Sequence, residues 1–435
     1  MKDSGIKWIG KIPDGWSTIR IKFTSWLKGR IGWDGLKSSE FVEKGPYLIT
    51  GTDFENGGIN WNTCVHISEA RYQEDELLHI KENDLLITKD GTIGKLAIVK
   101  NCPEKVSLNS GVMIIRGNSQ YKYSDKYLYY VLQSDEFFIW FELSQNGNST
   151  IRHLYQGQFY NFEFSYPTID EQQAIAAFLD KKCFVIDNLI SNETKQIEKL
   201  KEFKQAIITE TMTKGLNKNV PMIDSGIEWI GEIPYNVNVS SVKNFYDITL
   251  GKMLQPKQEN ENDTLEYYFC AANLGNNCLK TNDLKQMWFS VKEKEKYSLK
   301  RGDLLVVEGG DVASSSIIVT DVSNIYFQNS IHRVRPIHGL NEYLHYYLIF
   351  VKGSGYFDVN CNKATIMHFT KDEFSNLPFL IRNTEEQKKI VTFLNKEETK
   401  INRLISIKEK KIEFLTNYKK SLIYEYVTGK KRVSL

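Results

Sequence analysis

The stretch Asp3-Ser-Gly-Ile-Lys-Trp-Ile-Gly-Lys-Ile-Pro13 returns later in the chain as Asp224-Ser-Gly-Ile-Glu-Trp-Ile-Gly-Glu-Ile-Pro234, with nine of its eleven positions identical. A second match closes each copy, since Glu171-Gln172 recurs as Glu386-Gln387. The two matches are offset by 221 and 215 residues, so the chain is one unit of about 215–220 residues written twice. Two copies of this length do not make a solenoid, and the function has to use two similar modules.

The segments between these boxes are related but diverged. Residues 84–99 read as strand, glycine-containing turn and strand, and residues 303–319 follow the same plan. Short matches continue to Thr150-Ile-Arg-His153 and Thr365-Ile-Met-His368, while the residues around them differ. We therefore expect two modules with a common frame and different surfaces.

Each copy ends in a stretch that predicts one long helix, from Glu171 to about Thr213 in the first copy. No Pro or Gly interrupts either stretch, and Gly215 and Gly429 follow them. Apolar residues recur at three- and four-residue steps, and each maps onto an apolar residue 215 positions later. A long helix cannot bury a narrow apolar stripe against itself, so we predict an antiparallel coiled coil of the two helices, with exposed polar faces. Packing of each helix on its own half is the alternative. The predicted seam consists of Leu179, Ile186, Ile190, Ile197, Leu200, Leu394, Ile401, Ile405, Ile412 and Leu415.

The composition is that of an ordinary globular protein of two or three domains. The chain has 435 residues, of which 41% are hydrophobic and 25% are charged, and its net charge of +2 neither demands nor excludes nucleic acid. Its six cysteines form no C-x-x-C pair, so neither a disulfide framework nor a metal site is expected. No signal peptide and no membrane-spanning run is evident, and we expect a cytoplasmic, reduced protein.

Sequence motifs of common enzymes are missing. There is no phosphate-binding P-loop, no Pro-Pro motif of amino-methyltransferases and no complete dinucleotide-binding loop. His153 and His368 are isolated histidines with a structural interpretation, and Trp8 and Trp229 are better interpreted as hydrophobic anchors than as stacking platforms. We expect no catalysis by this chain alone.

The duplicated boxes resemble the specificity subunit of type I restriction–modification systems. The resemblance covers the whole chain: two variable regions, each entered by D-S-G-I-x-W-I-G-x-I-P and left by E-Q-x-x-I-x-x-F-L. The second motif appears as Glu171, Gln172, Ile175, Phe178 and Leu179, and again as Glu386, Gln387, Ile390, Phe393 and Leu394.

This resemblance implies an α+β fold with two mixed α/β target recognition domains separated by the paired helices. The implied boundaries are 1–167 and 221–381 for the recognition domains, and 168–220 and 382–435 for the helices. Each recognition domain would read one half of a bipartite DNA target. Two modification subunits would supply S-adenosylmethionine and adenine methylation, and restriction subunits would supply ATP- and Mg-dependent translocation and cleavage. No cofactor or metal is expected on this chain.

Within the recognition domains, polar and basic loop residues are the candidates for DNA contact, and ordinary polar turns are their alternative interpretation. The candidates are Lys28, Arg30, Lys37, Thr52, Lys89, Thr92, Lys95, Asn148, Arg152, Lys252, Gln255, Lys257, Asn273, Ser314, Ser315, Arg333 and Lys363.

Three alternative functions remain. They are a specificity subunit of a methylation-only or phase-variable system, a non-DNA coiled-coil scaffold, and a self-contained nuclease or methyltransferase.

Overall fold

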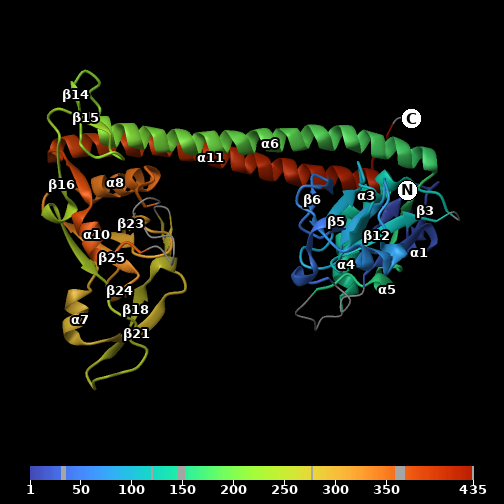
Figure 1. The fold of residues 1–435 in the computed structure, drawn as a ribbon, viewed down its shortest axis with the longest axis horizontal. Helices are drawn as coiled ribbons and strands as arrows, with labels where there is room; N and C mark the ends of the chain where they lie inside the picture. Colours follow the sequence, from blue (N-terminus) through green and yellow to red (C-terminus); the bar gives the residue numbers. More distant parts are fainter. Residues whose placement is uncertain (31–35, 119–120, 146–151, 276–277, 358–367, 434–435) are drawn as a thin grey trace. The chain divides into compact units, whose positions relative to one another are not determined.

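The computed structural model describes residues 1–30, 36–118, 121–145, 152–275, 278–357 and 368–433. The chain forms two compact units, one of residues 1–194 with 409–435 and one of residues 195–408. Each unit therefore contains a part of each long helix (Figure 1).

The described part of the first unit contains a four-stranded sheet, a three-stranded sheet, three two-stranded ladders (β1-β2, β13-β3 and β6-β7) and short helices, besides its portions of the long helices. Four strands pair in the order β10-β9-β12-β4 and three in the order β11-β5-β8, where β5 is parallel to β11 and antiparallel to β8. The elements are β1 (Lys2–Asp3), β2 (Lys11–Ile12), β3 (Ser17–Arg20), α1 (Ile21–Thr24), β4 (Ser25–Gly29), η2 (Ser38–Glu40), β5 (Val42–Ile49), β6 (Phe54–Glu55), β7 (Gly58–Ile59), β8 (Val65–His66), α2 (Glu69–Gln73), η3 (Glu76–Leu78), β9 (Leu85–Thr88), β10 (Leu96–Ile98), β11 (Val106–Leu108), β12 (Val112–Gly117), α3 (Asp125–Gln133), α4 (Asp135–Ser144), α5 (Gln156–Phe159) and β13 (Glu163–Tyr166).

The second unit repeats this topology strand for strand. Its four-stranded sheet has the order β23-β22-β25-β17, and in its three-stranded sheet β18 is parallel to β24 and antiparallel to β21. The elements are β14 (Met222–Asp224), β15 (Glu232–Pro234), β16 (Asn238–Ser241), η4 (Val242–Asn244), β17 (Tyr246–Leu250), β18 (Thr264–Phe269), η5 (Ala271–Asn273), β19 (Leu274–Gly275), β20 (Cys278–Leu279), β21 (Lys285–Phe289), α7 (Val291–Lys296), β22 (Leu304–Val307), β23 (Ser315–Ile317), β24 (Ile325–Phe327), β25 (Ile331–Pro336), α8 (Asn341–Gly353), α10 (Lys371–Asn376) and β26 (Pro378–Ile381).

The central strands of the four-stranded sheets are buried on both faces. In β9, Leu85 and Ile87 belong to the large core beside the helices, whereas Leu86 faces a smaller core beneath the three-stranded sheet. In β22, Leu304 and Leu305 divide between the two corresponding cores in the same way. This explains why both strands are continuous apolar runs rather than alternating ones.

The duplicated opening box folds as a short hairpin that anchors each unit. β1 pairs with β2, and β14 pairs with β15. Trp8 packs against the large core and donates its indole N–H to the carbonyl oxygen of Glu163 at 2.8 Å. Trp229 packs on Phe350 and Tyr356. Both tryptophans are hydrophobic anchors, as the sequence predicts.

The two long helices are α6 (Ile169–Lys214), of 46 residues, and α11 (Thr384–Val427), of 44 residues. Gly215 and Gly429 follow them with positive φ angles of 74° and 69°. The repeated glutamine fixes where each helix starts, because Gln172 donates to the carbonyl oxygen of Pro167 at 2.9 Å and accepts from the backbone N–H of Ser124 at 2.9 Å. Gln387 makes the same two contacts, with Arg382 and Leu340.

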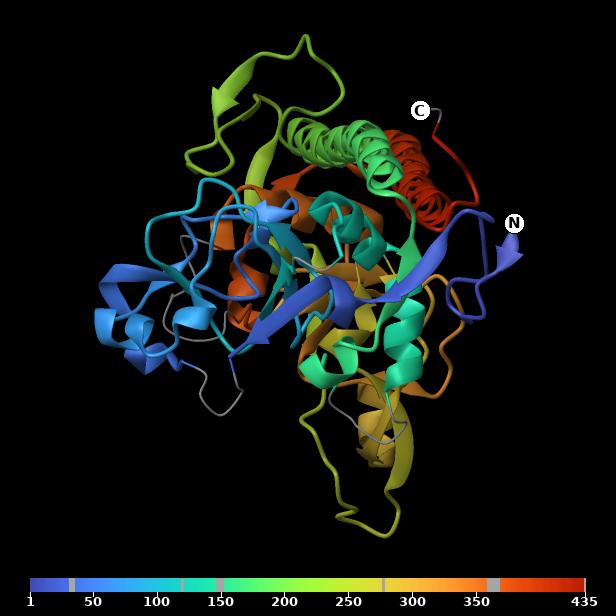
Figure 2. The same ribbon diagram turned by 90° about the vertical axis from the view of Figure 1, so that its right-hand side faces the viewer.

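Within each unit, α6 and α11 run antiparallel and in contact (Figure 1, Figure 2). In the first unit, the ring centroids of Phe178 and Tyr426 are 4.4 Å apart, and the ammonium of Lys411 lies 2.7 Å from the carboxylate of Glu193. In the second unit, Lys204 lies 3.3 Å from Glu398. Residues nearer the end of one helix therefore contact residues nearer the start of the other. This confirms the predicted antiparallel pairing inside each unit.

The seam residues differ in burial along the helices. Seven of them are buried: Leu179, Ile186, Ile197, Leu394, Ile401, Ile405 and Leu415. Ile190, Leu200 and Ile412 are half-buried. Leu179, Ile186 and Leu415 share a core cluster with sheet residues, so the helices also pack on their own units, which was the alternative.

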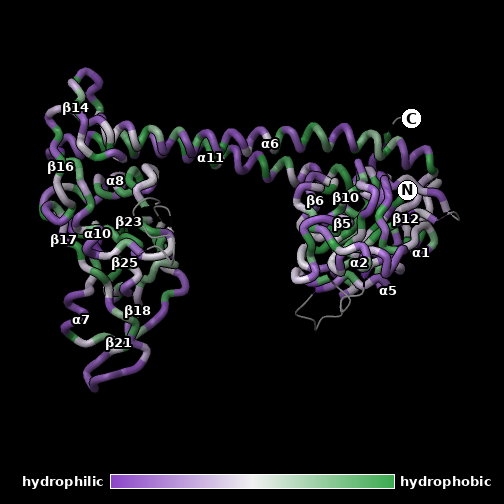
Figure 3. Tube along the Cα trace, viewed as in Figure 1, coloured by the Kyte–Doolittle hydropathy of each residue, from purple (hydrophilic) through white to green (hydrophobic). Residues whose placement is uncertain are grey.

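The expectation of polar outer faces holds only in part: most exposed positions of both helices are polar, but apolar ones recur among them. Green apolar positions recur along both helices in Figure 3, and several of these residues are exposed. Pairing of the two helices needs only the apolar residues of the seam. Both helices carry additional apolar residues outside it. The exposed ones are Phe184, Val185, Leu189, Phe203, Phe393, Leu404, Ile407, Phe414 and Tyr418.

Candidate functional site

In the first unit, two of the candidate cations support loops from inside. Lys89, at the end of β9, is buried and donates from Nζ to the carbonyl oxygen of Arg30 at 2.9 Å. Burial lowers the pKa of this lysine. Arg30 is only 2% exposed and donates to the carbonyl oxygen of Leu108 at 3.3 Å. Both side chains face inward, so they hold the loop backbone and do not form its outer surface.

The turn between β9 and β10 presents the other candidates of this segment to solvent. Thr92 and Lys95 are exposed. The hydroxyl of Thr88 donates to the carbonyl oxygen of Thr92 at 2.6 Å and accepts from the backbone N–H of Lys95 at 2.9 Å. Because its backbone is fixed in this way, the turn can present an ammonium and a hydroxyl in a defined position.

The remaining candidates of the first unit lie at or near the surface. Lys37, Thr52 and Arg152 are exposed, and Arg152 pairs with Glu142. Lys28 is half-buried, and its ammonium lies 2.8 Å from Asp75. Asn148 lies outside the described residues.

In the second unit, Lys252 and Arg333 are buried among internal partners. Lys252 donates to Gln255 at 2.6 Å and pairs with Glu293. Arg333 donates to the carbonyl oxygens of Lys296 and Ser298 at 2.9 and 2.8 Å. These side chains position the start of the loop after β17 and the end of α7. Gln255 is half-buried, and Lys257 is exposed.

The last candidates of this unit are also engaged internally. The side-chain oxygen of Asn273 accepts from the backbone N–H of Cys270 at 2.9 Å. Ser314, in the turn between β22 and β23, and Ser315, the first residue of β23, are 7% and 5% exposed and contact side chains of the same unit. Lys363 lies outside the described residues. The structure therefore leaves Lys37, Thr52, Thr92, Lys95, Arg152 and Lys257 as candidates with exposed side chains.

A polar hollow in the first unit was not predicted. It has a volume of about 490 Å³ and surrounds the β6–β7 hairpin. Trp61 is held there by a 3.0 Å hydrogen bond from its indole N–H to the carbonyl oxygen of Lys100, and Asn62 beside it is exposed. Asn56-Gly57-Gly58 and Asn60-Trp-Asn62 alternate amides with an aromatic ring, and this pattern was the available sequence signal. Amide and indole groups suit base edges and flat rings.

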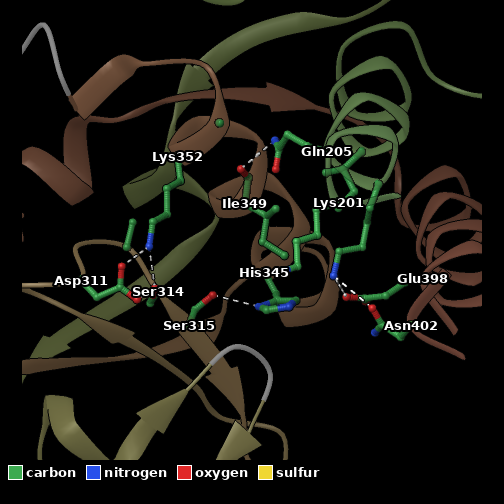
Figure 4. Close-up of a pocket in the computed structure, with 14 residues that line it drawn as sticks. Lys201, Gln205, Asp311, Ser314, Ser315, His345, Ile349, Lys352, Glu398 and Asn402 are labelled. Atoms are coloured by element: carbon green, nitrogen blue, oxygen red, sulfur yellow. Dashed lines mark hydrogen bonds and ion pairs between the residues drawn. The ribbon is translucent and has the colours of Figure 1, made fainter. Parts of the chain in front are cut away.

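A cavity of about 660 Å³ lies in the second unit between α8, the β22–β23 turn and the helix pair (Figure 4). Lys352 contacts Asp311 and Ser314, and Lys204 contacts Glu398 and Asn402. Each of these two lysines already pairs with a carboxylate that lines the cavity. We therefore do not interpret them as phosphate contacts.

Thiol and metal chemistry find no support in the described part of the chain. Burial raises the pKa of Cys64 to about 12 and those of Cys102 and Cys183 to about 11, so these thiols remain protonated at neutral pH. Among the described residues, no three His, Cys, Asp or Glu side chains gather as a metal site would require. In the same residues, no helix has the length and apolar character needed to cross a membrane.

Comparison with known proteins gives one consistent result. Residues 32–202 and 234–427 each match the family model of the type I restriction modification DNA specificity domain. The MjaVIII type I restriction enzyme specificity subunit of Methanocaldococcus jannaschii is 26% identical over 97% of this chain and 94% of its own length. The putative MjaX specificity subunit of the same organism is 25% identical over 98% and 96%.

Two solved structures share the fold. One is a chain from work on complex assembly and conformational transition of the type I R-M system, with a TM-score of 0.71, 14% identity, and coverage of 97% of this chain and all of that one. The other is the HsdS subunit of Thermoanaerobacter tengcongensis, with a TM-score of 0.50, 14% identity, and coverage of 97% and 98%.

Proposed function

This chain belongs to the type I restriction–modification DNA specificity family, and on that premise we propose that residues 1–167 and 221–381 are its two target recognition domains, joined by helices within 168–220 and 382–435. It is a specificity subunit with two recognition domains, and its role is to determine which DNA sequence the type I complex recognises. Specificity subunits are not the catalytic components of these systems.

One observation carries the proposal that each domain reads a different half-site. The two units have the same strand order in both sheets, but the loops between equivalent strands differ in sequence. A common frame with different loops is what two readers of unlike half-sites require, since base edges are read by side chains and the frame only places them.

The exposed cations and hydroxyls are the proposed DNA contacts. Lys37, Lys95 and Lys257 supply charge for phosphates or guanine edges, and Thr52 and Thr92 supply hydroxyl groups. Arg152 is exposed as well, and it would contact DNA by exchanging Glu142 for a phosphate or a base. The role of the buried candidates is indirect: they hold the loops from which such contacts are made. These candidates are Arg30, Lys89, Lys252 and Arg333. Trp61 and Asn62 are added to the contact surface of the first domain.

The exposed apolar residues of the long helices are the proposed docking surface for modification subunits. Leu189 and Leu404 are equivalent in the repeat, are 40% and 48% exposed, and lie in different units. Phe414 and Tyr418 add a stacked, exposed aromatic pair in the first unit. Exposed apolar clusters commonly mark protein interfaces, and an equivalent position in each unit supports two modification subunits per chain.

The chemistry is assigned to the partners. S-adenosylmethionine belongs to the modification subunits, and ATP and Mg belong to restriction subunits. Such a complex would act on DNA in the cytoplasm.

An exchange of one recognition domain tests the proposal. The chain is purified with its modification subunits, and methylated adenines are mapped on a library of random DNA. Replacing residues 17–167 by the equivalent segment of a relative should change one half-site and leave the other as it was. A change of both half-sites would contradict the two-reader model, and one modification subunit per chain in native mass measurement would contradict the proposed stoichiometry.

A further inference from the structure

Each recognition domain meets the helix pair of its own unit through a buried tyrosine. In the first unit, Tyr130 of α3 donates its hydroxyl to the carboxylate of Asp180 on α6 at 2.9 Å. In the second unit, Tyr346 of α8 donates to the carboxylate of Glu398 on α11 at 2.8 Å, and its hydroxyl lies 2.8 Å from the side-chain oxygen of Asn395. The two tyrosines are 4% and 2% exposed.

The two junctions are equivalent in the repeat but use different acids. Asp180 corresponds to Asn395 at the offset of 215, and the carboxylate of the second junction instead comes from Glu398, one turn along the helix. A lysine pairs with the carboxylate of each junction, Lys126 of α3 with Asp180 and Lys204 of α6 with Glu398 at 3.3 Å. The same hydrogen bond is thus built twice from different residues.

The directionality of this bond distinguishes it from the apolar contacts around it. Burial of apolar surface stabilises the junction but is non-directional, so it tolerates small rotations of a domain on its helices. A hydrogen bond weakens steeply when its angle departs from linearity. The tyrosine–carboxylate contact is therefore suited to fix the angle at which the domain sits on its helix pair.

In the second unit the junction continues toward the turn between β22 and β23 and the start of β23. His345, next to Tyr346 in α8, is hydrogen-bonded through Nδ1 to the hydroxyl of Ser315 at 2.8 Å (Figure 4). Lys352 of the same helix holds Ser314 at 2.8 Å. Thus α8 is tied on one side to α11 and on the other to the β22–β23 turn, next to a cavity of about 660 Å³ that gives the domain room to shift if the tie is lost.

We propose that Tyr130 and Tyr346 are positioning residues that fix the orientation of each recognition domain on the helix pair, and thereby restrict the complex to one length of unread DNA between the half-sites. They do not touch DNA in this role. The inference rests on the proposed function, because it concerns how the two readers are held.

The test measures gap preference separately from half-site preference. The complex with modification subunits methylates a library in which the two half-sites are constant and the gap varies by single base pairs. We expect Tyr130→Phe and Tyr346→Phe to keep both half-sites, while the preference for the native gap over gaps one base pair longer or shorter falls by about tenfold.

Two further variants keep the outcome interpretable. Tyr347→Phe removes a neighbouring buried hydroxyl that bonds the carbonyl oxygen of Pro378 at 2.6 Å inside the domain, so it should cost stability but keep the gap. Asn395→Ala with Glu398→Ala removes the partners of Tyr346 from α11, and with them the ion-pair partner of Lys204, but leaves the recognition domain unaltered, and it should relax the gap as Tyr346→Phe does.

Three results are decisive. An unchanged gap in Tyr346→Phe and in the α11 variant overturns the inference. Equal relaxation in Tyr347→Phe also overturns it, because the effect would then reflect stability alone. A parent complex that methylates no bipartite site would instead refute the proposed function.

Discussion

At the scale of single residues, burial separates the cations that support the loops from the exposed ones, which are the proposed DNA contacts. Lys89 and Lys95 stand at the two ends of one turn, yet the first is 7% exposed and the second is solvent-exposed. Residue type and loop position, which are all that the sequence supplies, are the same for both. The difference arises because Lys89 Nζ reaches the carbonyl oxygen of Arg30, a contact between residues 59 positions apart that no local pattern encodes.

This pair gives a matched test. Lys89→Met leaves the Arg30 carbonyl without its donor and should lower the free energy of unfolding by about 1–3 kcal/mol. Lys95→Met should leave stability unchanged, weaken binding to all sequences alike and reduce the salt dependence of binding by about one charge. Urea denaturation and DNA titrations at several salt concentrations measure both. A stable Lys89→Met protein with an altered half-site would show that Lys89 reads bases.

A buried carboxyl makes stability depend on pH. Glu136, at the start of α4, is fully buried, and its side chain accepts a hydrogen bond from the hydroxyl of Ser165 at 2.7 Å. Burial raises its pKa from 4.5 to about 8. The folded state therefore binds the proton more tightly than the unfolded state, and this group's contribution to stability is lost as pH rises from about 4.5 to about 8.

Glu136→Gln should remove this loss. Glu136 can change the free energy of unfolding by at most about 1.4 kcal/mol per pH unit. The variant should be more stable than the parent at pH 8 but not at pH 4.5. Glu142→Gln, an exposed change on the same helix, is the control. Thermal unfolding across this pH range decides the matter, and parallel profiles for parent and Glu136→Gln would contradict the assignment.

At the scale of elements, periodic features were predictable and contacts between distant segments were not. The long helices, the two strand–turn–strand segments and the duplication follow from local pattern, and the structure has all three. The parallel pairing of β5 with β11 joins strands with several elements between them, and no periodicity specifies it. The role of Gln172 was also missed, because its partner Ser124 lies 48 residues earlier.

The two sides of α11 should respond differently to charge. Leu415 is 9% exposed within the core of the first unit, so Leu415→Glu buries an unpaired carboxylate and should cost several kcal/mol, about 3 or more. Leu404→Glu changes a leucine that is 48% exposed on the same helix and should leave stability within about 0.5 kcal/mol while weakening capture of modification subunits. Thermal unfolding and quantitative co-purification measure the two effects. Loss of stability in both variants would mean that the exposed face has a structural role.

At the scale of the whole molecule, the helices are the proposed ruler between two readers, and the structure defines where that ruler can be lengthened. The end of α6 is held inside the second unit, because Arg382 donates to the carbonyl oxygen of Thr213 at 3.0 Å. An insertion near Thr213 would therefore disturb this contact and not extend the connection. The chain passes between units at Thr194–Lys195 and again at Lys408–Glu409, and both helices have to be extended there.

Seven residues inserted at both places should add about 10.5 Å and keep the seam in register. The unread gap should then grow by about three base pairs, at ~3.4 Å each, with both half-sites unchanged. Insertion in one helix alone leaves the two helices of unequal length between the units, so their seam residues no longer face one another. This protein should not methylate DNA. Mapping of methylated adenines on randomised DNA reads out all three proteins, and an unchanged gap in the doubly extended protein would show that the helices do not set the distance.

The division of the long helices between units also dictates an order of events on the ribosome. The second unit is one continuous segment, residues 195–408, whereas the first unit needs residues 409–435 as well. The hydroxyl of Tyr127 bonds the carbonyl oxygen of Val427 at 2.9 Å, so part of the first core is filled by residues made 300 positions later. The half translated first is therefore completed last, and until then a nascent chain exposes the core residues that pack against the end of α11.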